Sequence, residues 1–160
     1  MKGKKKNDFL LIGLALILLG GLFIYSMATR VKGEVAFVKV SNQLVLEISL
    51  RDGTYSAKNP SNLIVSSVPV TIDGFDLVTE TEVIELEFGK TIVNYQNKFY
   101  VLGALGVVEI EYKDHKVRVS EEKSPYNICS RQGFSDIAPI VCLPNFVTIE
   151  FSNDTDVIIG

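Results

Sequence analysis

The sequence predicts an all-β barrel or sandwich with one short helix, preceded by a single N-terminal transmembrane helix. The β prediction comes from short apolar runs after residue 34, separated by turn signals about every 8–12 residues. The transmembrane prediction comes from residues 9–29, a run of 21 residues without a charge. The short helix is expected after Ser124-Pro125, where a hydroxyl cap precedes a proline.

The uncharged run is long enough to cross a bilayer, because 21 helical residues extend about 30 Å. Basic residues crowd its N-terminal side, and only Arg30 and Lys32 follow it; the preceding ones are Lys2, Lys4, Lys5 and Lys6. The positive-inside rule therefore predicts a cytoplasmic N-terminus and an extracytoplasmic domain in the cell membrane. A signal peptide cleaved after Ala28 is the alternative, but the apolar run exceeds the usual length of about 7–15 residues.

These signals divide the chain into five parts. They are a basic cytoplasmic leader (1–8), a transmembrane helix (9–29), a linker (30–33), an extracytoplasmic β domain (34–151) and a tail (152–160). The first 30 residues carry a net charge of +4 and the whole chain −3, so residues 31–160 carry −7. An acidic domain without a basic cluster argues against nucleic acid as a partner.

Alternating apolar residues place the strands. From Leu44 to Leu50 every second residue is a leucine or isoleucine, so we expect a strand with one buried face. A strand over Val35 to Val40 is expected before it, joined to it by a turn at Ser41-Asn42. The other expected strands are Leu63 to Ile72, interrupted by Pro69, then Val83 to Phe88, Thr91 to Tyr95, Phe99 to Leu102, Val108 to Tyr112, Val117 to Val119 and Phe146 to Phe151.

The helix signals and both cysteines lie together. Tyr126 to Gln132 is expected to form one or two helical turns that include Cys129, ended by Gly133. Twelve residues separate Cys129 from Cys142, so this is not a C-x-x-C redox motif. Outside the cytoplasm the pair favours a structural disulfide, whereas in the cytosol both residues would be buried thiols. A catalytic dithiol using Cys129 and Cys142 is the alternative.

The remaining polar residues predict no catalytic, cofactor or metal site. Two thiols and the single His115, in an expected turn, fall short of a zinc site and of a serine-protease triad. Glutamates two apart on expected strands share a face, and such pairs can serve glycoside hydrolysis; they are Glu85 with Glu87 and Glu109 with Glu111. A solvated strand face is the simpler interpretation, because nothing apolar marks a cleft around them.

Two stretches, Glu121 to Gly133 and Ile140 to Asn145, resemble the signature of the NusG domain II family. More narrowly, the chain is similar to the membrane-anchored single-domain proteins of Gram-positive bacteria. The resemblance extends over residues 99–151 and, more weakly, 34–55; residues 58–98 are interpreted as an insertion. Phe134 and Ala138-Pro139 stand where such proteins often have an aromatic residue and then Pro-Gly.

The resemblance implies a NusG domain II-like fold. It also implies an association with flavin-linked extracellular electron transfer or with small membrane transporters. We therefore expect a non-catalytic, membrane-anchored binding or accessory module. Its expected partners are the lipid bilayer, through residues 9–29, and an integral-membrane protein. Phe134, Ile137, Leu143 and Phe146 are interpreted first as a small core packed under the helix. The alternative is a docking patch formed by Phe134 and Ile137 at the tip of the loop that the disulfide would hold.

Overall fold

The computed structural model describes residues 3–28, 32–58 and 61–153, with the side chains of 3–10 and 27–28 left out. Half of the predicted linker, residues 30–31, lies outside these residues, as does most of the predicted tail, residues 154–160. The chain separates into two compact units, the first ending at Val31 and the second beginning at Lys32.

The first unit is one helix, α1 (Gly3–Ala28). It covers most of the run for which the sequence predicted a transmembrane helix, and most of its described side chains, from 11 to 26, are exposed. Among the described residues, no helix is both long and apolar enough to cross a membrane.

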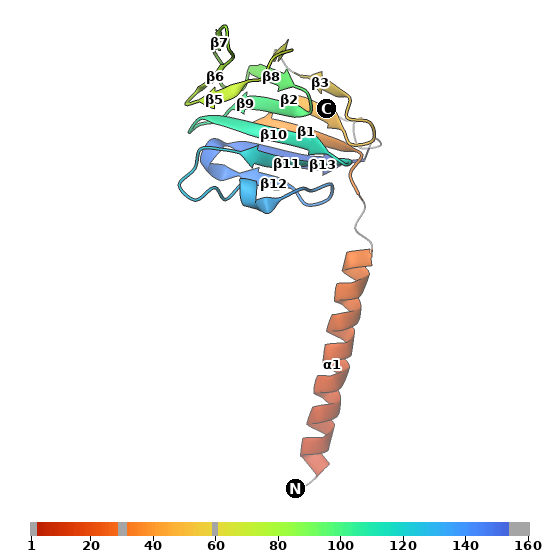
Figure 1. Cartoon of the computed structure of the whole chain (residues 1–160). Coiled ribbons are helices and arrows are strands. Elements are labelled where there is room, and N and C mark those ends of the chain that lie inside the picture. The colour runs from red at the N-terminus through yellow and green to blue at the C-terminus, as the bar shows by residue number, and fades with distance from the viewer. Residues whose placement is uncertain (1–2, 29–31, 59–60, 154–160) are drawn as a thin grey trace. The chain divides into compact units, whose positions relative to one another are not determined.

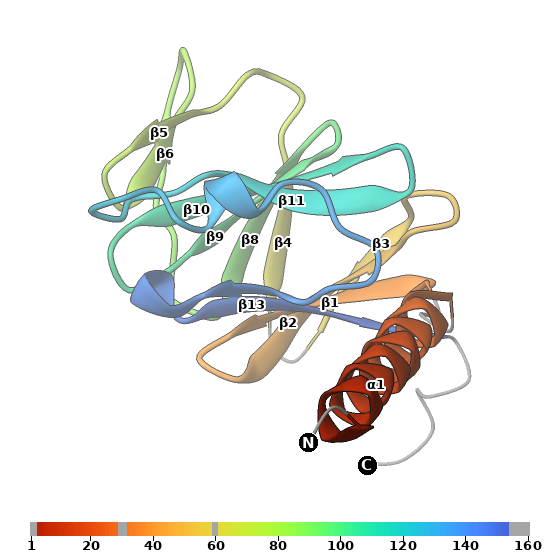
Figure 2. The ribbon, with the colours of Figure 1, turned by 90° about the horizontal axis from the view of Figure 1, so that it is seen from below.

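The second unit contains two five-stranded sheets (Figures 1 and 2). The first has the order β12-β13-β1-β2-β3, and its strands are β1 (Val35–Val40), β2 (Gln43–Ser49), β3 (Tyr55–Ala57), β12 (Ile140–Cys142) and β13 (Val147–Ser152). The second has the order β11-β10-β9-β8-β4, and its strands are β4 (Asn62–Val65), β8 (Thr91–Tyr95), β9 (Lys98–Leu102), β10 (Val107–Lys113) and β11 (Lys116–Glu121). All pairs are antiparallel except β4 with β8.

The two sheets share one apolar core. Val38 and Ile48 from the first sheet and Phe99 and Ile110 from the second are at most 1% exposed and belong to the same cluster. In neither sheet do the two outer strands pair with each other, so within the described residues both sheets are open. Of the two predicted architectures, a closed barrel is therefore wrong, and the mostly β domain is confirmed.

A third, smaller sheet lies on the other face of the second one. It consists of β5 (Thr71–Asp73), β6 (Asp76–Val78) and β7 (Val83–Ile84). Leu77 of β6 packs in a second cluster with Val93, Tyr100 and Val107. Because successive side chains of a strand point to opposite faces, β8 and β9 are buried on both sides.

Local sequence signals explain several boundaries. Ser41 and Asn42 both have positive φ, 49° and 67°, as a tight two-residue hairpin turn requires. Between Val38 and Lys39 the register of β1 with β2 shifts, which leaves Val45 as an extra residue. Val45 is therefore buried next to Leu46, although strict alternation predicted an exposed position.

The predicted helix over Tyr126 to Gln132 is wrong in length. The structure has only a 3-10 turn there, η1 (Ser130–Gln132), and a second, η2 (Leu143–Asn145), follows β12. Asn127 has a positive φ of 49°, which a right-handed helix does not accommodate. Gly133 follows η1 with φ 74°, in keeping with its predicted place beyond the helix end, but with an extended ψ.

Candidate functional site

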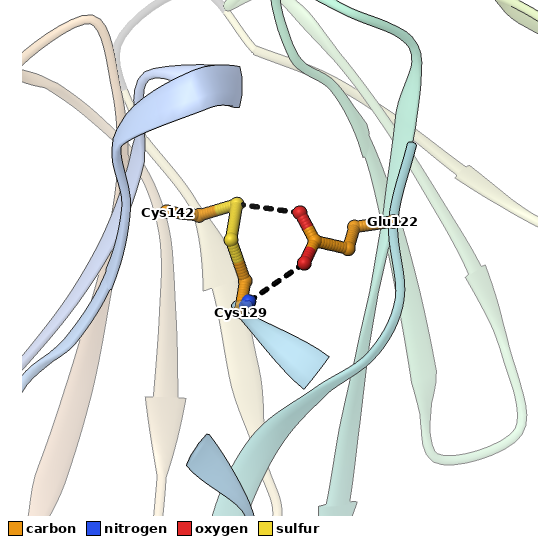
Figure 3. A group of neighbouring side chains, drawn as sticks. All are labelled: Glu122, Cys129 and Cys142. Atoms are coloured by element: carbon orange, nitrogen blue, oxygen red, sulfur yellow. Dashed lines mark hydrogen bonds between the residues drawn. A yellow bond between two sulfur atoms is a disulfide. The ribbon is translucent and has the colours of Figure 1, made fainter. Parts of the chain in front are cut away.

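Cys129 and Cys142 form a disulfide (Figure 3). The bond lies within residues 122–146, here called the stapled segment, which leads from β11 through η1, β12 and η2 to β13. Cys129 is 1% exposed and Cys142 is not exposed at all. Both cysteines belong to the main core. The bond therefore links the residue before η1 to β12, an outer strand of the first sheet, within that core.

Glu122 directs its carboxylate at this disulfide (Figure 3). Its Oε1 accepts a 2.6 Å hydrogen bond from the amide of Cys129 and a longer one, 3.4 Å, from the amide of Ser130. Its Oε2 lies 3.1 Å from the Sγ of Cys142. A disulfide sulfur has no proton to donate, so this last contact becomes a donor–acceptor pair only when Cys142 is a thiol.

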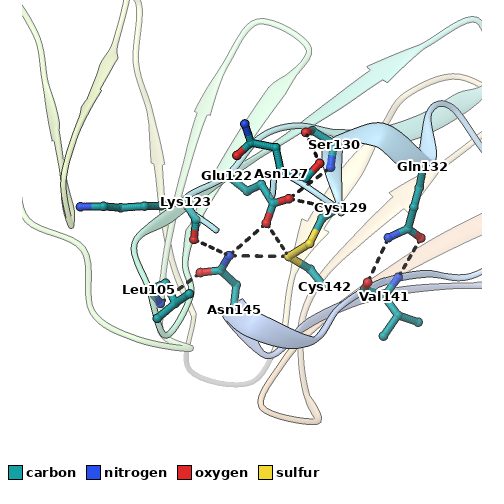
Figure 4. The surroundings of a disulfide bond; sticks show 10 residues. All are labelled: Leu105, Glu122, Lys123, Asn127, Cys129, Ser130, Gln132, Val141, Cys142 and Asn145. Carbon is teal, nitrogen blue, oxygen red and sulfur yellow. Dashed lines mark hydrogen bonds between the residues drawn. A yellow bond between two sulfur atoms is a disulfide. The ribbon is translucent and has the colours of Figure 1, made fainter. Parts of the chain in front are cut away.

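Asn145 completes the group and lies beside both Glu122 and Cys142 (Figure 4). Its side-chain amide donates to Glu122 Oε2 and to the carbonyl of Lys123, both at 3.3 Å. Its Oδ1 accepts from the amide of Leu105 at 3.1 Å. Asn145 is fully buried, so these bonds satisfy polar atoms that water cannot reach.

Gly103 explains how Asn145 reaches this position. A Cβ at residue 103 would lie 2.7 to 2.9 Å from three atoms of Asn145, closer than real Cβ contacts. The strand that precedes residue 103 can therefore approach η2 only because the residue has no side chain.

Sequence reasoning assigned neither Glu122 nor Asn145 a role in a site, although both lie in the two stretches that resemble the family signature. Glu122 was one of many acidic residues. Twenty positions separate Glu122 from Cys142, and no local pattern links the two. The fold creates the group by bringing the end of β11 beside η2.

This group could hold a metal only after reduction. The two sulfurs and a carboxylate oxygen of Glu122 all lie within 4.8 Å of one another. In the disulfide, however, neither sulfur is a thiolate, which is the form that binds zinc. The oxidised arrangement is thus that of a buried, hydrogen-bonded covalent crosslink.

The stapled segment also covers one outer strand of each main sheet. The side-chain amide of Gln132 donates to the carbonyl of Val141 at 3.0 Å, and its oxygen accepts from the amide of Val141 at 3.3 Å (Figure 4). Ser135 forms two backbone hydrogen bonds with Val117 on β11. The segment therefore satisfies outward-facing backbone groups on both β12 and β11.

Several large apolar side chains of the stapled segment are exposed. Tyr126 and Leu143 are 72% and 71% exposed, and the others in this group are Ile128, Phe134, Val141 and Phe146. Of the predicted docking patch, Phe134 lies on the surface with the guanidinium of Arg118 4.6 Å from its ring centre. Ile137 is half-buried. The structure leaves their predicted role in docking untested.

The two glutamates of the predicted pair Glu109 and Glu111 form ion pairs with different residues. Glu111 pairs with Arg118, whereas Glu109 is buried and pairs with Lys98 at 2.8 Å. Burial alone raises the pKa of Glu109, but hydrogen bonds from Lys98 and Ser120 outweigh burial and hold this pKa below its usual value. Burial and the charge of Glu109 raise the pKa of the neighbouring Tyr100.

His115 contacts backbone across the domain. Its Nδ1 lies 2.8 Å from the carbonyl oxygen of Leu50. This contact ties the β10–β11 turn to the end of β2 and gives the residue a structural partner.

Residues 55–155 match the model of a family described as NusG domain II. Among solved structures, the chain is similar to the crystal structure of the Lin0431 protein from Listeria innocua, with 16% identity, 75% of this chain and 95% of that chain covered, and a TM-score of 0.37. No curated protein matches the chain. The matched range includes residues 58–98, whose interpretation as an insertion stays a prediction.

Proposed function

The chain belongs to the NusG domain II family, and from this premise we propose that it is a non-catalytic binding or accessory module that docks a protein partner through its stapled segment. The observation that carries the proposal is the set of exposed apolar side chains between Tyr126 and Phe146. Single exposed apolar residues are ordinary, but a concentration of them on one segment is typical of interaction sites.

The disulfide gives this surface a fixed shape. Cys129 and Cys142 hold η1 and β12 together, and Glu122 and Asn145 hold the backbone around them. A segment that is already ordered loses less conformational entropy on binding than a free loop does. In this proposal the sulfurs contribute shape and stability and take no part in a reaction.

The proposed location is the outer face of the cell membrane. Residues 9–29 form an uncharged run of 21 residues, and four lysines precede it, which supports an N-terminus inside the cell and association with the bilayer. A partner in the same membrane would meet the domain at a raised effective concentration, so a weak interface suffices. A small transporter or a flavin-linked electron-transfer protein is the partner class that the family resemblance suggests.

Protease treatment of intact spheroplasts tests the location. The domain beyond residue 32 should be digested without breaking the membrane. If it is digested only after lysis, the proposed orientation is wrong.

Photo-crosslinking in intact membranes tests the docking. A photoreactive residue at Leu143 should give discrete protein adducts, and one at Phe88, exposed on another part of the domain, should give none. Equal labelling from both positions, or no adduct from Leu143, would contradict docking through the stapled segment.

A thiol–disulfide protein is the second candidate, and the contact between Glu122 and Cys142 favours it. Reduction by an external dithiol would oxidise that dithiol and leave two thiols, with the Cys142 proton placed to hydrogen-bond to Glu122. Burial of both cysteines opposes this candidate, because an attacking thiolate cannot reach either sulfur without local opening.

A further inference from the structure

The two main sheets have four outer strands, and these differ in whether other residues cover or bond to their outward-facing backbone groups. The outer strands are β12 and β3 in the first sheet and β11 and β4 in the second. A free edge offers a row of N–H and C=O groups to any other extended chain, and proteins usually cover or shorten such edges.

Three of the four edges are covered or short. Gln132 bonds to the outer side of β12 at Val141, and Ser135 bonds to β11 at Val117. The third, β3, has three residues, and Lys58 directly after it pairs with Glu47 at 2.9 Å. A short strand flanked by charge is a poor template for further pairing.

The fourth edge, β4, has four residues, and within the described residues no other segment covers it and no charge follows it directly. The amide of Asn62 donates to the carbonyl of Lys90, directly before β8, and the amide of Ser66 donates to the carbonyl of Asn94 on β8. In a parallel pair alternate residues face the neighbouring strand, so the N–H and C=O groups of Leu63 and Val65 point away from β8. Within residues 32–58 and 61–153, no hydrogen bond reaches these outward groups.

The side chains of β4 are also suited to contact another strand. All four residues of Asn62–Val65 are exposed, and three of them are large and apolar. No charge occurs from Asn62 to Val70. An exposed, uncharged, β-branched edge is the arrangement to which extended peptides add as a new strand.

We propose that β4 is a strand-addition site for an extended, uncharged apolar peptide segment of a partner protein. The outward groups of Leu63 and Val65 would supply the hydrogen bonds, and Ile64 and its neighbours the apolar contacts. This inference rests on the proposed function as a binding module, because it names the chemistry of a bound partner. It uses a surface on β4, separate from the stapled segment.

A peptide fits this edge better than a second copy of the chain does. Four residues extend about 13 Å, whereas a stable dimer of folded domains buries upwards of roughly 1,000 Å². A partner segment held at the same membrane needs less area, because tethering raises its effective concentration.

The test measures amide hydrogen exchange by NMR on the full chain in lipid nanodiscs. The probe is an acetylated, amidated peptide of about six alternating valines and threonines. Exchange of the Leu63 and Val65 amides should slow at least about tenfold when the probe is present at saturating concentration. The same peptide with N-methyl groups along one edge should have no effect, because it cannot pair through that edge.

Two variants sharpen the test. Val65→Pro removes an outward N–H and should abolish the protection at Leu63, while Val65→Thr keeps the backbone and should retain it. Slow exchange of the Ile64 amide, which faces β8, reports that the strand is intact in each variant. If Val65→Pro disturbs the strand, the comparison of the two peptides on the unaltered chain still shows whether the peptide pairs with β4.

Three results would overturn the proposal. The first is no protection of β4 by the peptide, and the second is equal protection by its N-methylated form. The third is a chain that sediments as a dimer with Leu63 and Val65 protected before any peptide is added, which would assign the edge to a second copy. Failure here leaves crosslinking from Leu143 unaffected, so the two proposals are judged separately.

Discussion

The amide of Cys129 donates a 2.6 Å hydrogen bond to the carboxylate of Glu122, seven residues earlier in the chain. Both residues are buried, so the bond satisfies a backbone donor that water cannot reach. The same carboxylate accepts from Asn145 on η2. The Glu122 side chain thus connects the end of β11 to Cys129, directly before η1, and to Asn145 on η2.

Glu122→Ala should destabilise the domain by about 2–3 kcal/mol, because it leaves the Cys129 amide and one Asn145 donor buried without their acceptor. Urea denaturation of the variant and the unaltered chain measures this difference. Glu121→Gln, at the neighbouring exposed position, is the control and should change stability by less than about 0.5 kcal/mol. Equal effects of the two substitutions would show that the Glu122 hydrogen bonds contribute little.

Gly103→Ala should also be destabilising, by about 1–3 kcal/mol, because the new methyl group would overlap Asn145. The same denaturation measurement applies. Ala104→Ser, at the next residue, which is exposed, is the control and should remain near the unaltered stability. An unchanged midpoint for Gly103→Ala would mean that η2 moves away freely.

Joint replacement Cys129→Ser and Cys142→Ser should lower stability by about 3 kcal/mol, the chain-entropy value for a loop of this length. Calorimetry measures the loss, and partner crosslinking from Leu143 should persist at temperatures where the variant is folded. If the unaltered chain oxidises an external dithiol and the folded double variant does not, while both still crosslink to the partner, the thiol–disulfide candidate is favoured.

The predictability of this fold depends on how local each signal is. The β1–β2 turn at Ser41-Asn42 and the strand β8 at Thr91–Tyr95 were predicted correctly, because alternation and turn residues act over a few positions. The helix at Tyr126 was overestimated. Its cap signals were misleading, because the Ser124 hydroxyl is buried without a hydrogen-bond partner and caps no helix. In addition, Asn127 adopts a left-handed conformation and the disulfide holds Cys129 against the sheet.

The contacts between residues far apart in the chain could not be predicted from local sequence patterns. The disulfide pairing could be predicted because the chain has two cysteines. Glu122 is one of 19 acidic residues, and only the strand order brings it to Cys142. The closed-barrel alternative failed for a similar reason, since local alternation does not show whether the outer strands of two sheets pair with each other.

Glu109 should make the domain sensitive to acid. Its pKa is lower in the folded domain than the ordinary value of 4.5, so its stabilising contribution is present above about pH 4.5 and is lost as the pH falls through the folded pKa. Glu109→Gln should therefore be less stable than the unaltered chain at neutral pH, and the difference should shrink in acid. Thermal melts between about pH 3 and 7 measure it. Glu85→Gln, on an exposed residue, is the control, and a difference that stays constant with pH would contradict the role of Glu109.

Phe134→Ala separates docking from folding. The ring is at the surface against Arg118, so its loss opens no core cavity and should cost less than about 1 kcal/mol of stability. If Phe134 contributes to the docking surface, partner crosslinking from Leu143 should fall about tenfold or more, as for an aromatic anchor of an interface. Phe88→Ala, a matched exposed phenylalanine away from the stapled segment, should leave crosslinking unchanged. If both variants dock equally well, Phe134 is no part of the binding surface, and the contact must be made by other exposed residues such as Leu143 and Phe146.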